Sequence, residues 1–444
     1  MRNIRRISLA AFAVALLLPN VAQADRRAKN RAEVLSRGRG YYKDLFMDGG
    51  VALTSRTSLP VARFLGVSME YYASASSAKL SQKDTLMQSA IFVGDEKDTN
   101  GRLLYPDGAP RYRMIYVNGG KSGAHGRSLG EEGRDRLRAY VAAGGSYVGT
   151  CAGAYFGSRS SMSRKGEARN QDSYLGLWPG GTCFTGLRKS YTPLRLDRKS
   201  PLFRYFDFGG DGLVDSVRHN GGCIAYENAN SQLPKGTEPL ARYVFDDNRK
   251  VRINNKLAVW GYKANAESGR VILCGSHPEA IAQGERLEFM SAMVLYAMDG
   301  NAAPKIKGEL RAGELREMNK RTEDNDPLYT RIGDRQYHHF AVDVPKKCKK
   351  MVVYLDGYED AKRYDLTLCA KRGEMAFHDN TLQKNVARGC KKRLIIDAPK
   401  AGKWYLSVFC ETTVTALTGK YGTYYTGRTG VLNGVPYNIR VEFK

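Results

Sequence analysis

The chain of 444 residues is predicted to fold as an α/β domain, with a parallel sheet covered by helices on both faces, followed by an all-β sandwich. Two observations predict this fold. Between about residues 41 and 300, short apolar runs alternate with longer amphipathic segments, which is typical of strands alternating with helices. From about residue 328 onwards, apolar residues recur with a period of two between turn-forming residues, as in a β-sandwich.

In the α/β domain, the predicted helix at 131–143 has Leu137, Tyr140 and Val141 on its apolar side and ends at Gly144. Further helices are expected at 57–65, directly after the strand-to-helix turn at Cys151, and at 286–298. The region between about 160 and 260 is rich in loops and antiparallel-looking pieces. The expected strands are short apolar runs at 42–47, 68–73, 113–117, 146–148, 258–262 and 271–274.

Residues 301–326 form a charged connector, expected to be partly helical around 308–321, and residues 327–444 form the sandwich. The expected sandwich strands alternate in hydropathy and lie at 337–342, 351–355, 364–368, 394–397, 404–409 and 437–443.

The first 24 residues have the pattern of an export signal. A basic segment at 1–6 precedes an apolar run at 9–18 and a small-residue cleavage site ending at Ala24. The alternative is an uncleaved membrane anchor, but the apolar run is short for a membrane span. We therefore expect cleavage, a flexible basic lead-in at 25–40, no later transmembrane segment, and a periplasmic or extracellular location.

The formal net charge is +25, from 70 Lys and Arg against 45 Asp and Glu. These basic residues are spread over both domains, and no nucleic-acid-binding motif accompanies them. For an exported protein, an anionic cell-surface polymer is a more natural partner than a nucleic acid. The alternative is a basic surface that is merely solvated.

The chain has eight cysteines, an even number that favours disulfides in an oxidising compartment. We expect two bridges among Cys348, Cys369, Cys390 and Cys410, with the pairing left open. No CxxC or HExxH spacing occurs, so no metal site and no cofactor are predicted in the α/β domain.

The segment Gly144 to Ser158 (GGSYVGTCAGAYFGS) predicts a strand, a sharp turn of small residues carrying Cys151, and a helix. This arrangement is typical of a nucleophile elbow. The N-terminal end of the helix would favour a thiolate over a thiol and prepare a site for an acyl-transfer oxyanion. The alternative is a buried cysteine with no chemical role.

A second segment, GRVILCGSHPEA, predicts a buried strand that ends before His277 and Glu279. A histidine and an acid two residues apart can share one loop, where the carboxylate fixes the ring tautomer and the other ring nitrogen faces a thiol. The alternative is a histidine that only caps the strand.

The chain resembles the class I glutamine amidotransferase-like superfamily in four segments, taken in their order and spacing. These are Asn118-Gly119-Gly120, the elbow, the HNGG sequence at 219–222 and the His277 segment. Within it, residues 41–300 resemble the biotin-protein ligase N-terminal-like family. The resemblance implies a flavodoxin-like sheet. It also implies a Cys151–His277–Glu279 triad, an oxyanion hole from Ala152 with Gly119 or Gly120, and pocket contacts from Asn118, His219, Asn220 and Gly221.

Two features depart from this family. A proline often precedes the paired glycines, whereas this chain has Asn118, and no ammonia-accepting synthase domain is recognisable. Hydrolysis of a γ-glutamyl or other amide bond fits export better than ammonia transfer does.

The C-terminal part resembles bacterial pre-peptidase C-terminal domains, through PLYTRIGDRQYHHFAVDVP, KRYDLTLCAKRG and IIDAPKAGKWYLSVF. The resemblance implies an accessory sandwich that binds a substrate or surface. Some relatives bind calcium near their start, where this chain has Glu323, Asp324, Asn325 and Asp326. The alternative is a solvated acidic linker.

The sequence thus predicts an exported thiol amidohydrolase that acts on a small amide or peptide substrate. Two other hypotheses remain open: a catalytically silent protein that binds a small ligand or a cell-surface polymer, and a structural envelope protein. Substrate specificity is expected to lie in the loop-rich region between 160 and 260.

Overall fold

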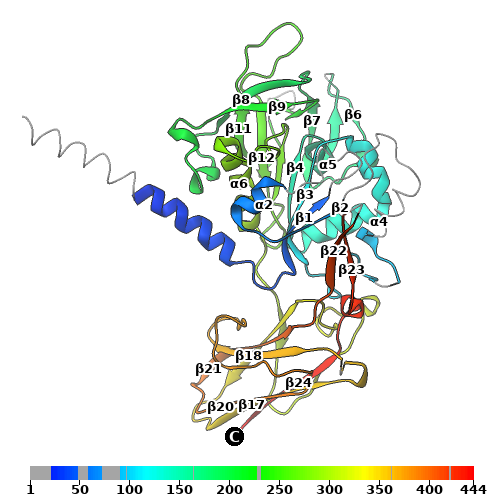
Figure 1. Cartoon of the computed structure of the whole chain (residues 1–444), viewed down its shortest axis with the longest axis vertical. Helices are drawn as coiled ribbons and strands as arrows, with labels where there is room; N and C mark the ends of the chain where they lie inside the picture. The colour runs from blue at the N-terminus through cyan, green and yellow to red at the C-terminus, as the bar shows by residue number, and fades with distance from the viewer. Residues whose placement is uncertain are drawn as a thin grey trace, which may run out of the picture.

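The computed structural model describes residues 22–48, 59–72, 91–96, 98–163, 165–227, 232–361, 363–419 and 422–444. The chain forms two lobes, with the β-rich C-terminal lobe, coloured yellow to red, below the larger α/β lobe (Figure 1). Most of the predicted signal peptide, and parts of the predicted helix at 57–65 and strand at 68–73, lie outside the described residues.

The core of the α/β lobe is a parallel sheet of five strands in the order β2-β1-β3-β4-β13. Each strand is four to six residues long and rich in buried apolar residues, as expected for strands covered on both faces. The strands are β1 Lys43–Asp48, β2 Met69–Tyr72, β3 Tyr112–Val117, β4 Ser146–Thr150 and β13 Val271–Cys274.

The whole sheet is mixed rather than parallel, which corrects the prediction. Beyond β13 it continues through antiparallel strands, and at the other edge a hairpin from the C-terminal region joins β2 through the single pair Tyr72 and Gly422. The hairpin comes from a distant segment of the chain, so local hydropathy could not place it. The added strands are β12 Leu257–Tyr262, β11 Glu238–Tyr243, β8 Ser190–Leu196, β9 Leu213–His219, β22 Thr415–Gly419 and β23 Gly422–Thr426.

Helices cover both faces of the parallel strands, as predicted. Along β3, Met114 and Tyr116 join the core beneath one face, while Ile115 and Val117 join the core beneath the other, because successive side chains alternate. The first core includes α2 and α6, and the second includes α4 and α5. The helices are α2 Pro60–Leu65, α4 Ser122–Ala142, α5 Ala152–Gly157 and α6 Gly284–Asp299.

A small second sheet, in the order β10-β7-β5-β6, follows the elbow helix in the loop-rich region. Its strands are β5 Ser158–Met162, β6 Ala168–Arg169, β7 Trp178–Phe184 and β10 Cys223–Ala225. Short 3-10 helices occur at Gln171–Ser173, Pro201–Arg204, Phe208–Gly210, Thr322–Asp324, Glu359–Ala361 and Thr429–Asn433.

Residues 22–36 are helical, so the expectation of a flexible lead-in at 25–40 is wrong. Val34 is buried, and its carbonyl accepts a hydrogen bond from Arg113 Nη2 at 2.9 Å. Arg27 pairs with Asp207 at 2.9 Å. This segment is ordered by partners far away in the sequence, which its own composition does not reveal.

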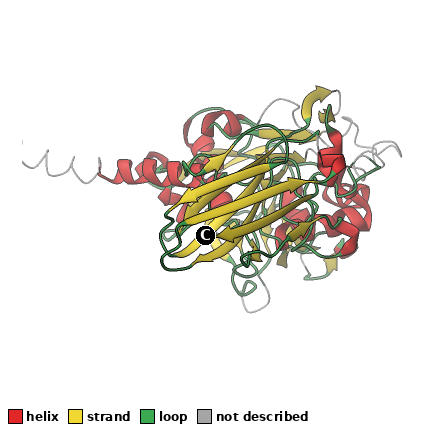
Figure 2. Cartoon of the chain, turned by 90° about the horizontal axis from the view of Figure 1, so that it is seen from below, coloured by secondary structure: helices red, strands yellow, loops and turns green. Residues whose placement is uncertain are grey.

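The C-terminal lobe consists of two sheets that share one core, with residues such as Val342 and Leu406 from one sheet and Val353 and Val441 from the other (Figure 2). This agrees with the expectation of a β-rich C-terminal region. The larger sheet, in the order β14-β16-β21-β18-β19, comprises β14 Ile306–Glu309, β16 Tyr337–Val344, β21 Gly402–Cys410, β18 Leu366–Arg372 and β19 Lys384–Asn385. The smaller, in the order β15-β24-β17-β20, comprises β15 Arg316–Met318, β24 Tyr437–Phe443, β17 Lys350–Gly357 and β20 Lys392–Asp397.

The connector between the lobes is not helical around 308–321, contrary to the prediction. It contributes β14 and β15, which pair with β16 and β24 at the edges of the two sheets. Pairing with these strands outweighs the weak helical preference of the segment.

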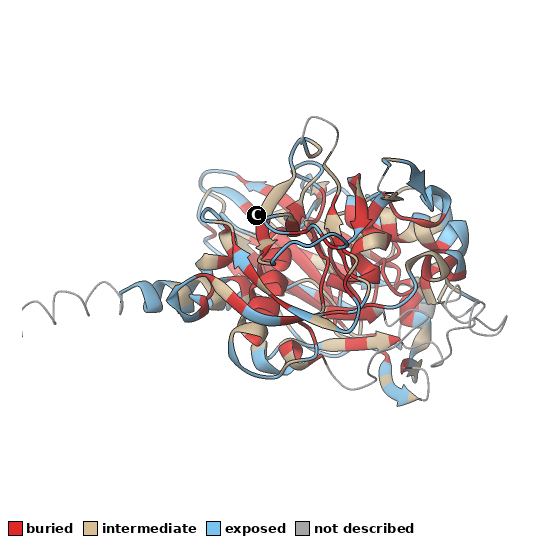
Figure 3. Ribbon diagram, turned by 90° about the horizontal axis from the view of Figure 1, so that it is seen from above, coloured by how far each residue is buried: buried red, intermediate tan, exposed pale blue. Residues whose placement is uncertain are grey.

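The predicted disulfides are absent, because all eight cysteines are free. Several thiols instead lie against backbone carbonyl oxygens: Cys390 Sγ is 3.2 Å from the oxygen of Ala361, and Cys410 Sγ is 3.5 Å from that of Thr412. Buried residues concentrate in the strands, while the N-terminal helix is largely exposed (Figure 3). Within the described residues, no helix combines the length and apolar character that a membrane span needs.

Candidate active site

Cys151 occupies a sharp turn between β4 and α5, as the sequence predicted. Its φ of 48° and ψ of −105° are rarely adopted by residues other than glycine. The turn brings backbone atoms so close that larger residues would clash. A Cβ on Gly149 would lie 2.4 Å from the oxygen of Gly153, and a Cβ on Gly153 would lie 2.1 Å from the oxygen of Val117. The small residues around Cys151 are therefore a steric requirement of the elbow.

The thiol of Cys151 lies at the carboxyl end of the parallel strands. The Cys151 N–H donates to the carbonyl of Cys274 at 2.8 Å, which ties the elbow to the end of β13. The side chain is almost fully buried, and its sulfur is 4.0 Å from the carbonyl oxygen of Asn220. Ala152 begins α5, where backbone N–H groups have no acceptor within the helix.

His277 follows β13 and lies between Cys151 and Glu279. Its N–H donates to the carbonyl of Arg218 at 2.9 Å, which anchors the loop to β9. On the ring, Nδ1 is 2.8 Å from Glu279 Oε1, and the Cys151 thiol interacts with the same ring. The structure thus brings Cys151, His277 and Glu279 together in the order thiol, imidazole, carboxylate.

The surroundings of His277 favour its protonated form. Burial by itself lowers the pKa of the ring, but the hydrogen bonds to Cys151 and Glu279 and the charge of Glu279 outweigh burial and raise this pKa to about 10. At neutral pH the ring therefore carries a proton on each nitrogen. An imidazolium beside a thiol stabilises the thiolate, which is the reactive nucleophile.

The loop after β3 packs directly on the ring of His277. A Cβ on Gly119 would lie 2.4 Å from His277 Cε1, so only glycine fits at this position. Asn118 is buried, whereas Gly120 is exposed and has a φ of 142°. Because β3, β4 and β13 are neighbours, the ends of these three strands bring Gly119, Cys151 and His277 to one edge of the sheet.

Of the HNGG residues predicted to contact the pocket, Asn220 lies beside the thiol and His219 does not. The Asn220 carbonyl approaches the Cys151 sulfur, and Gly221 has a φ of 89°. His219 instead points into the core, where its Nε2 is 2.6 Å from Thr192 Oγ1. Burial, together with the charge of His277, lowers the pKa of His219 to about 4, so this ring is neutral at neutral pH.

The sequence interpretation missed two groups that support the site. The hydroxyl of Tyr155 donates to the carbonyl oxygens of Gly221 and Gly222, at 3.4 and 3.2 Å, and so fastens the HNGG loop to the elbow helix. The hydroxyl of Tyr116 lies 2.8 Å from Thr150 Oγ1, next to the elbow. Tyr155 is four residues after Cys151 on a helix, a spacing that places two residues on one face and could have revealed it.

Among the residues that the structure describes, no group of three or more His, Cys, Asp and Glu side chains is placed to hold a metal. In the acidic segment considered for calcium, Asp324 Oδ2 accepts the Arg321 N–H at 2.7 Å, so this carboxylate caps a turn. The calcium hypothesis for Glu323, Asp324, Asn325 and Asp326 has no support in the geometry.

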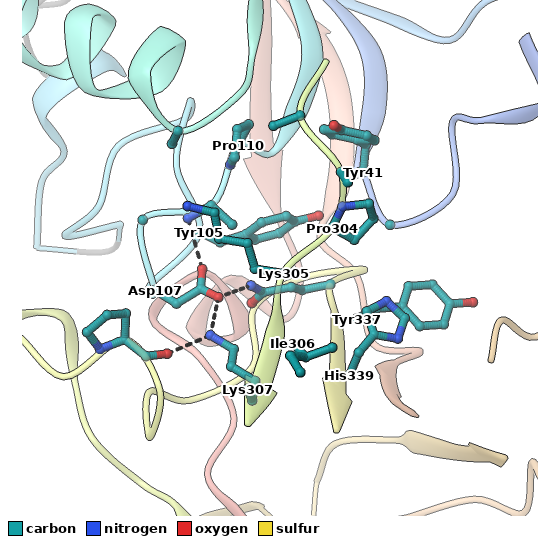
Figure 4. Close-up of a pocket in the computed structure, with 18 of the residues that line it drawn as sticks. Tyr41, Tyr105, Asp107, Pro110, Pro304, Lys305, Ile306, Lys307, Tyr337 and His339 are labelled. Atoms are coloured by element: carbon teal, nitrogen blue, oxygen red, sulfur yellow. Dashed lines mark hydrogen bonds and ion pairs between the residues drawn. The ribbon is translucent and has the colours of Figure 1, made fainter. Parts of the chain in front are cut away.

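Two cavities lie away from the thiol. One, of about 350 Å³, lies between the lobes and is lined by rings such as Tyr41, Tyr105 and Tyr337, above an ion pair of Asp107 and Lys307 (Figure 4). The other, of about 430 Å³, lies beside β7 and β10. Neither lining includes Cys151, His277 or Glu279.

Residues 109–293 match the model of the family described as "Biotin-protein ligase, N terminal". The match contains the glycine loop, the elbow, the HNGG loop and the His277 segment. It supports the predicted domain type for this part of the chain; the wider extent of 41–300 stays a prediction.

Several solved structures show low similarity. A glutamine amidotransferase is 19% identical, covers 42% of this chain and 80% of its own, and has a TM-score of 0.29. A ThuA-like protein from Bacteroides uniformis is 16% identical, covers 60% and 96%, and has a TM-score of 0.30. A pre-peptidase C-terminal domain of a Bacillus anthracis collagenase is 15% identical, covers 32% and 99%, and has a TM-score of 0.20. Similarities at these TM-scores do not establish a shared fold or function. No curated protein matches the chain.

Proposed function

We propose that this chain is a thiol amidohydrolase built on a flavodoxin-like, glutamine amidotransferase-like domain, with Cys151 as nucleophile. The parallel order β2-β1-β3-β4-β13 is the flavodoxin-like order, and it supports this assignment. The observation that carries the proposal is the contact series from Cys151 through His277 to Glu279, with the cysteine in a strained elbow conformation.

In the proposed reaction, the Cys151 thiolate attacks the carbonyl carbon of an amide. The oxyanion that forms accepts hydrogen bonds from the N–H of Ala152 and from that of Gly119 or Gly120. His277 then donates its proton to the departing amine as the C–N bond breaks and a thioester remains. His277 next takes a proton from a water molecule, whose oxygen attacks the thioester; the C–S bond breaks, a carboxylic acid leaves, and the Cys151 thiolate beside protonated His277 is regenerated.

Glu279 has a positioning role in this scheme. Its carboxylate accepts a hydrogen bond from Nδ1 of His277, which leaves Nε2 to face the sulfur. The carboxylate also stabilises the positive ring throughout the proton transfers. The loop at Gly119 limits rotation of the same ring by close contact.

Labelling with an electrophilic glutamine analogue, followed by intact-mass measurement, tests the nucleophile. We expect one adduct on the wild-type protein and none on Cys151→Ala or His277→Ala. Cys274→Ala is the matched control, because burial raises the pKa of this neighbouring thiol to about 12 and keeps it unreactive. An adduct that persists in Cys151→Ala would refute the proposed nucleophile.

Export and a surface-binding role of the C-terminal lobe complete the proposal. The pattern of the first 24 residues supports export, and the net charge of +25 supports contact with an anionic cell-surface polymer. The pre-peptidase-like character of the sandwich rests on its sequence motifs and its two-sheet architecture.

A second function is a catalytically silent protein that binds a small ligand, and the cavity between the lobes favours it. This cavity is lined mainly by tyrosine, proline and alanine side chains, as many ligand pockets are. Alkylation kinetics separate the two functions. An activated Cys151 reacts rapidly near pH 7, well below the ordinary thiol pKa of about 8.5, whereas a silent one does not.

A further inference from the structure

The second cavity, beside β7 and β10, has an unusual concentration of positive charge. Four of its eleven lining residues are basic, and only one is acidic. Together they enclose about 430 Å³, within the range of small-ligand sites. The basic residues are Arg249, Lys250, Arg252 and Lys256, and the acidic one is Glu227.

The charges in this cavity are only partly neutralised. Lys256 Nζ is 2.7 Å from a carboxylate oxygen of Glu227, so these two form a pair. The guanidinium groups of Arg249 and Arg252 are exposed, and neither makes an ion pair with any described acidic residue. A further cation lies at the edge, where the guanidinium carbon of Arg188 is 5.6 Å from the ring centre of Phe184, another lining residue.

The turn that carries these arginines is held by hydrogen bonds from its backbone N–H groups to side-chain oxygens of the same turn. Asn248 Oδ1 accepts the N–H groups of Lys250 and Val251, both at 2.9 Å. The neighbouring Asp247 Oδ1 accepts those of Ile253 and Asn254, at 2.8 and 2.9 Å. The carboxylate nearest the arginines in the sequence is therefore occupied by a structural role, and the arginine side chains are presented from an ordered turn.

The cavity is connected to the candidate active site by a short stretch of chain. Ala225, in its lining, is five residues after Asn220, whose carbonyl oxygen approaches the Cys151 sulfur. Five extended residues span at most about 18 Å, so a substrate of a few residues could contact both places. Strand β10, which lines the cavity, follows directly from the HNGG loop and pairs with β7.

We propose that this cavity binds an anionic group of the substrate, a carboxylate or a phosphate, while the amide lies at Cys151. Arginine suits both anions, because its planar guanidinium donates two parallel hydrogen bonds to them. The inference rests on the proposed amidohydrolase function, and it specifies the substrate class as an amide that carries a negative charge a few residues from the bond to be cleaved.

Titration of the Cys151→Ala protein tests the anion site without any turnover. The probes are acetyl-Glu-Glu-amide, its neutral counterpart acetyl-Gln-Gln-amide, and inorganic phosphate. We expect an anion to bind, the neutral peptide not to bind, and Arg249→Ala with Arg252→Ala to weaken anion binding at least about tenfold at 0.1 M salt. Binding of the acidic peptide identifies a carboxylate, and binding of phosphate alone identifies a phosphate group.

The matched control removes two other exposed positive charges, Arg198→Ala with Lys199→Ala, which lie outside the cavity lining. These changes are expected to leave anion binding unchanged. Equal weakening by both double variants would show a general effect of net charge and would overturn the proposal, as would the absence of binding by either anion. If the anion binds as expected but the wild-type thiol cannot be labelled, the anion site stands and the amidohydrolase function fails.

Discussion

The two lobes both bury histidines next to carboxylates, yet with opposite electrostatic outcomes. In the α/β lobe, His277 Nδ1 is 2.8 Å from Glu279, and the pKa of the ring is raised to about 10. In the sandwich, His338 Nε2 is 3.8 Å from Asp107, but the pKa of that ring is lowered well below its ordinary value.

The difference arises from what else surrounds each carboxylate. Asp107 is already paired with Lys307 at 2.5 Å, so burial and the lysine charge together keep His338 neutral. Glu279 has His277 as its partner, and one of its oxygens, Oε2, is buried without a hydrogen bond to any described residue. In this protein, a histidine beside a carboxylate is protonated where no third group neutralises the carboxylate, as at Glu279, and neutral where one does, as at Asp107.

The largest expected effect is the loss of turnover in Glu279→Gln, which tests whether the Glu279 charge distinguishes His277 from His338. The amide removes the charge that orients and stabilises the His277 ring, so turnover should fall by up to about 10⁴-fold while the fold is retained. Steady-state kinetics and circular dichroism measure the two consequences.

Asp107→Asn, which removes the carboxylate beside His338 of the sandwich, is the control. It breaks the buried pair with Lys307, so we expect a lower melting temperature but unchanged labelling of Cys151 in the folded protein. If both variants lowered labelling equally, the distinction between the two carboxylates would be wrong.

An intermediate effect is expected from Gly119→Ala. The added Cβ would lie 2.4 Å from His277 Cε1 and must displace the ring from the sulfur. A misplacement of about 1 Å typically costs about 10²-fold in rate. We expect this loss in kcat in a protein that still folds, and circular dichroism checks the second part. Full activity would show that the loop does not constrain the ring.

The smallest effects concern the pH dependence of stability. For His277 the folded pKa is above the unfolded value, so its contribution is complete below about pH 6.5 and is lost as the pH rises towards 10. For His339, which burial holds at a pKa of about 4, stability is lost as the pH falls from about 6.5 to 4. Denaturation from pH 4 to 10 should therefore show that His277→Ala flattens the alkaline decline, whereas His339→Gln flattens the acid decline. Identical profiles for the two variants would contradict this assignment.

The elbow at Cys151 and the contact between His277 and Glu279 could be predicted from the sequence alone. The small residues around Cys151 predict the elbow because its steric demands lie within a few residues, as at Gly149 and Gly153. His277 and Glu279 are likewise two residues apart, so their contact needs no long-range information. The hydropathy period distinguished the helix-covered parallel strands from the sandwich strands for the same local reason.

The contacts between segments far apart in the sequence could be known only from the tertiary structure. The β22–β23 hairpin at the sheet edge and Arg27 of the docked helix depend on partners more than a hundred residues away. The neutral state of His338 is also a tertiary property, since Asp107 and Lys307 approach it from different strands and loops. The number of cysteines likewise could not show that all eight are free. Disulfide pairing depends on the positions of the thiols in space, and a cysteine count contains no such information.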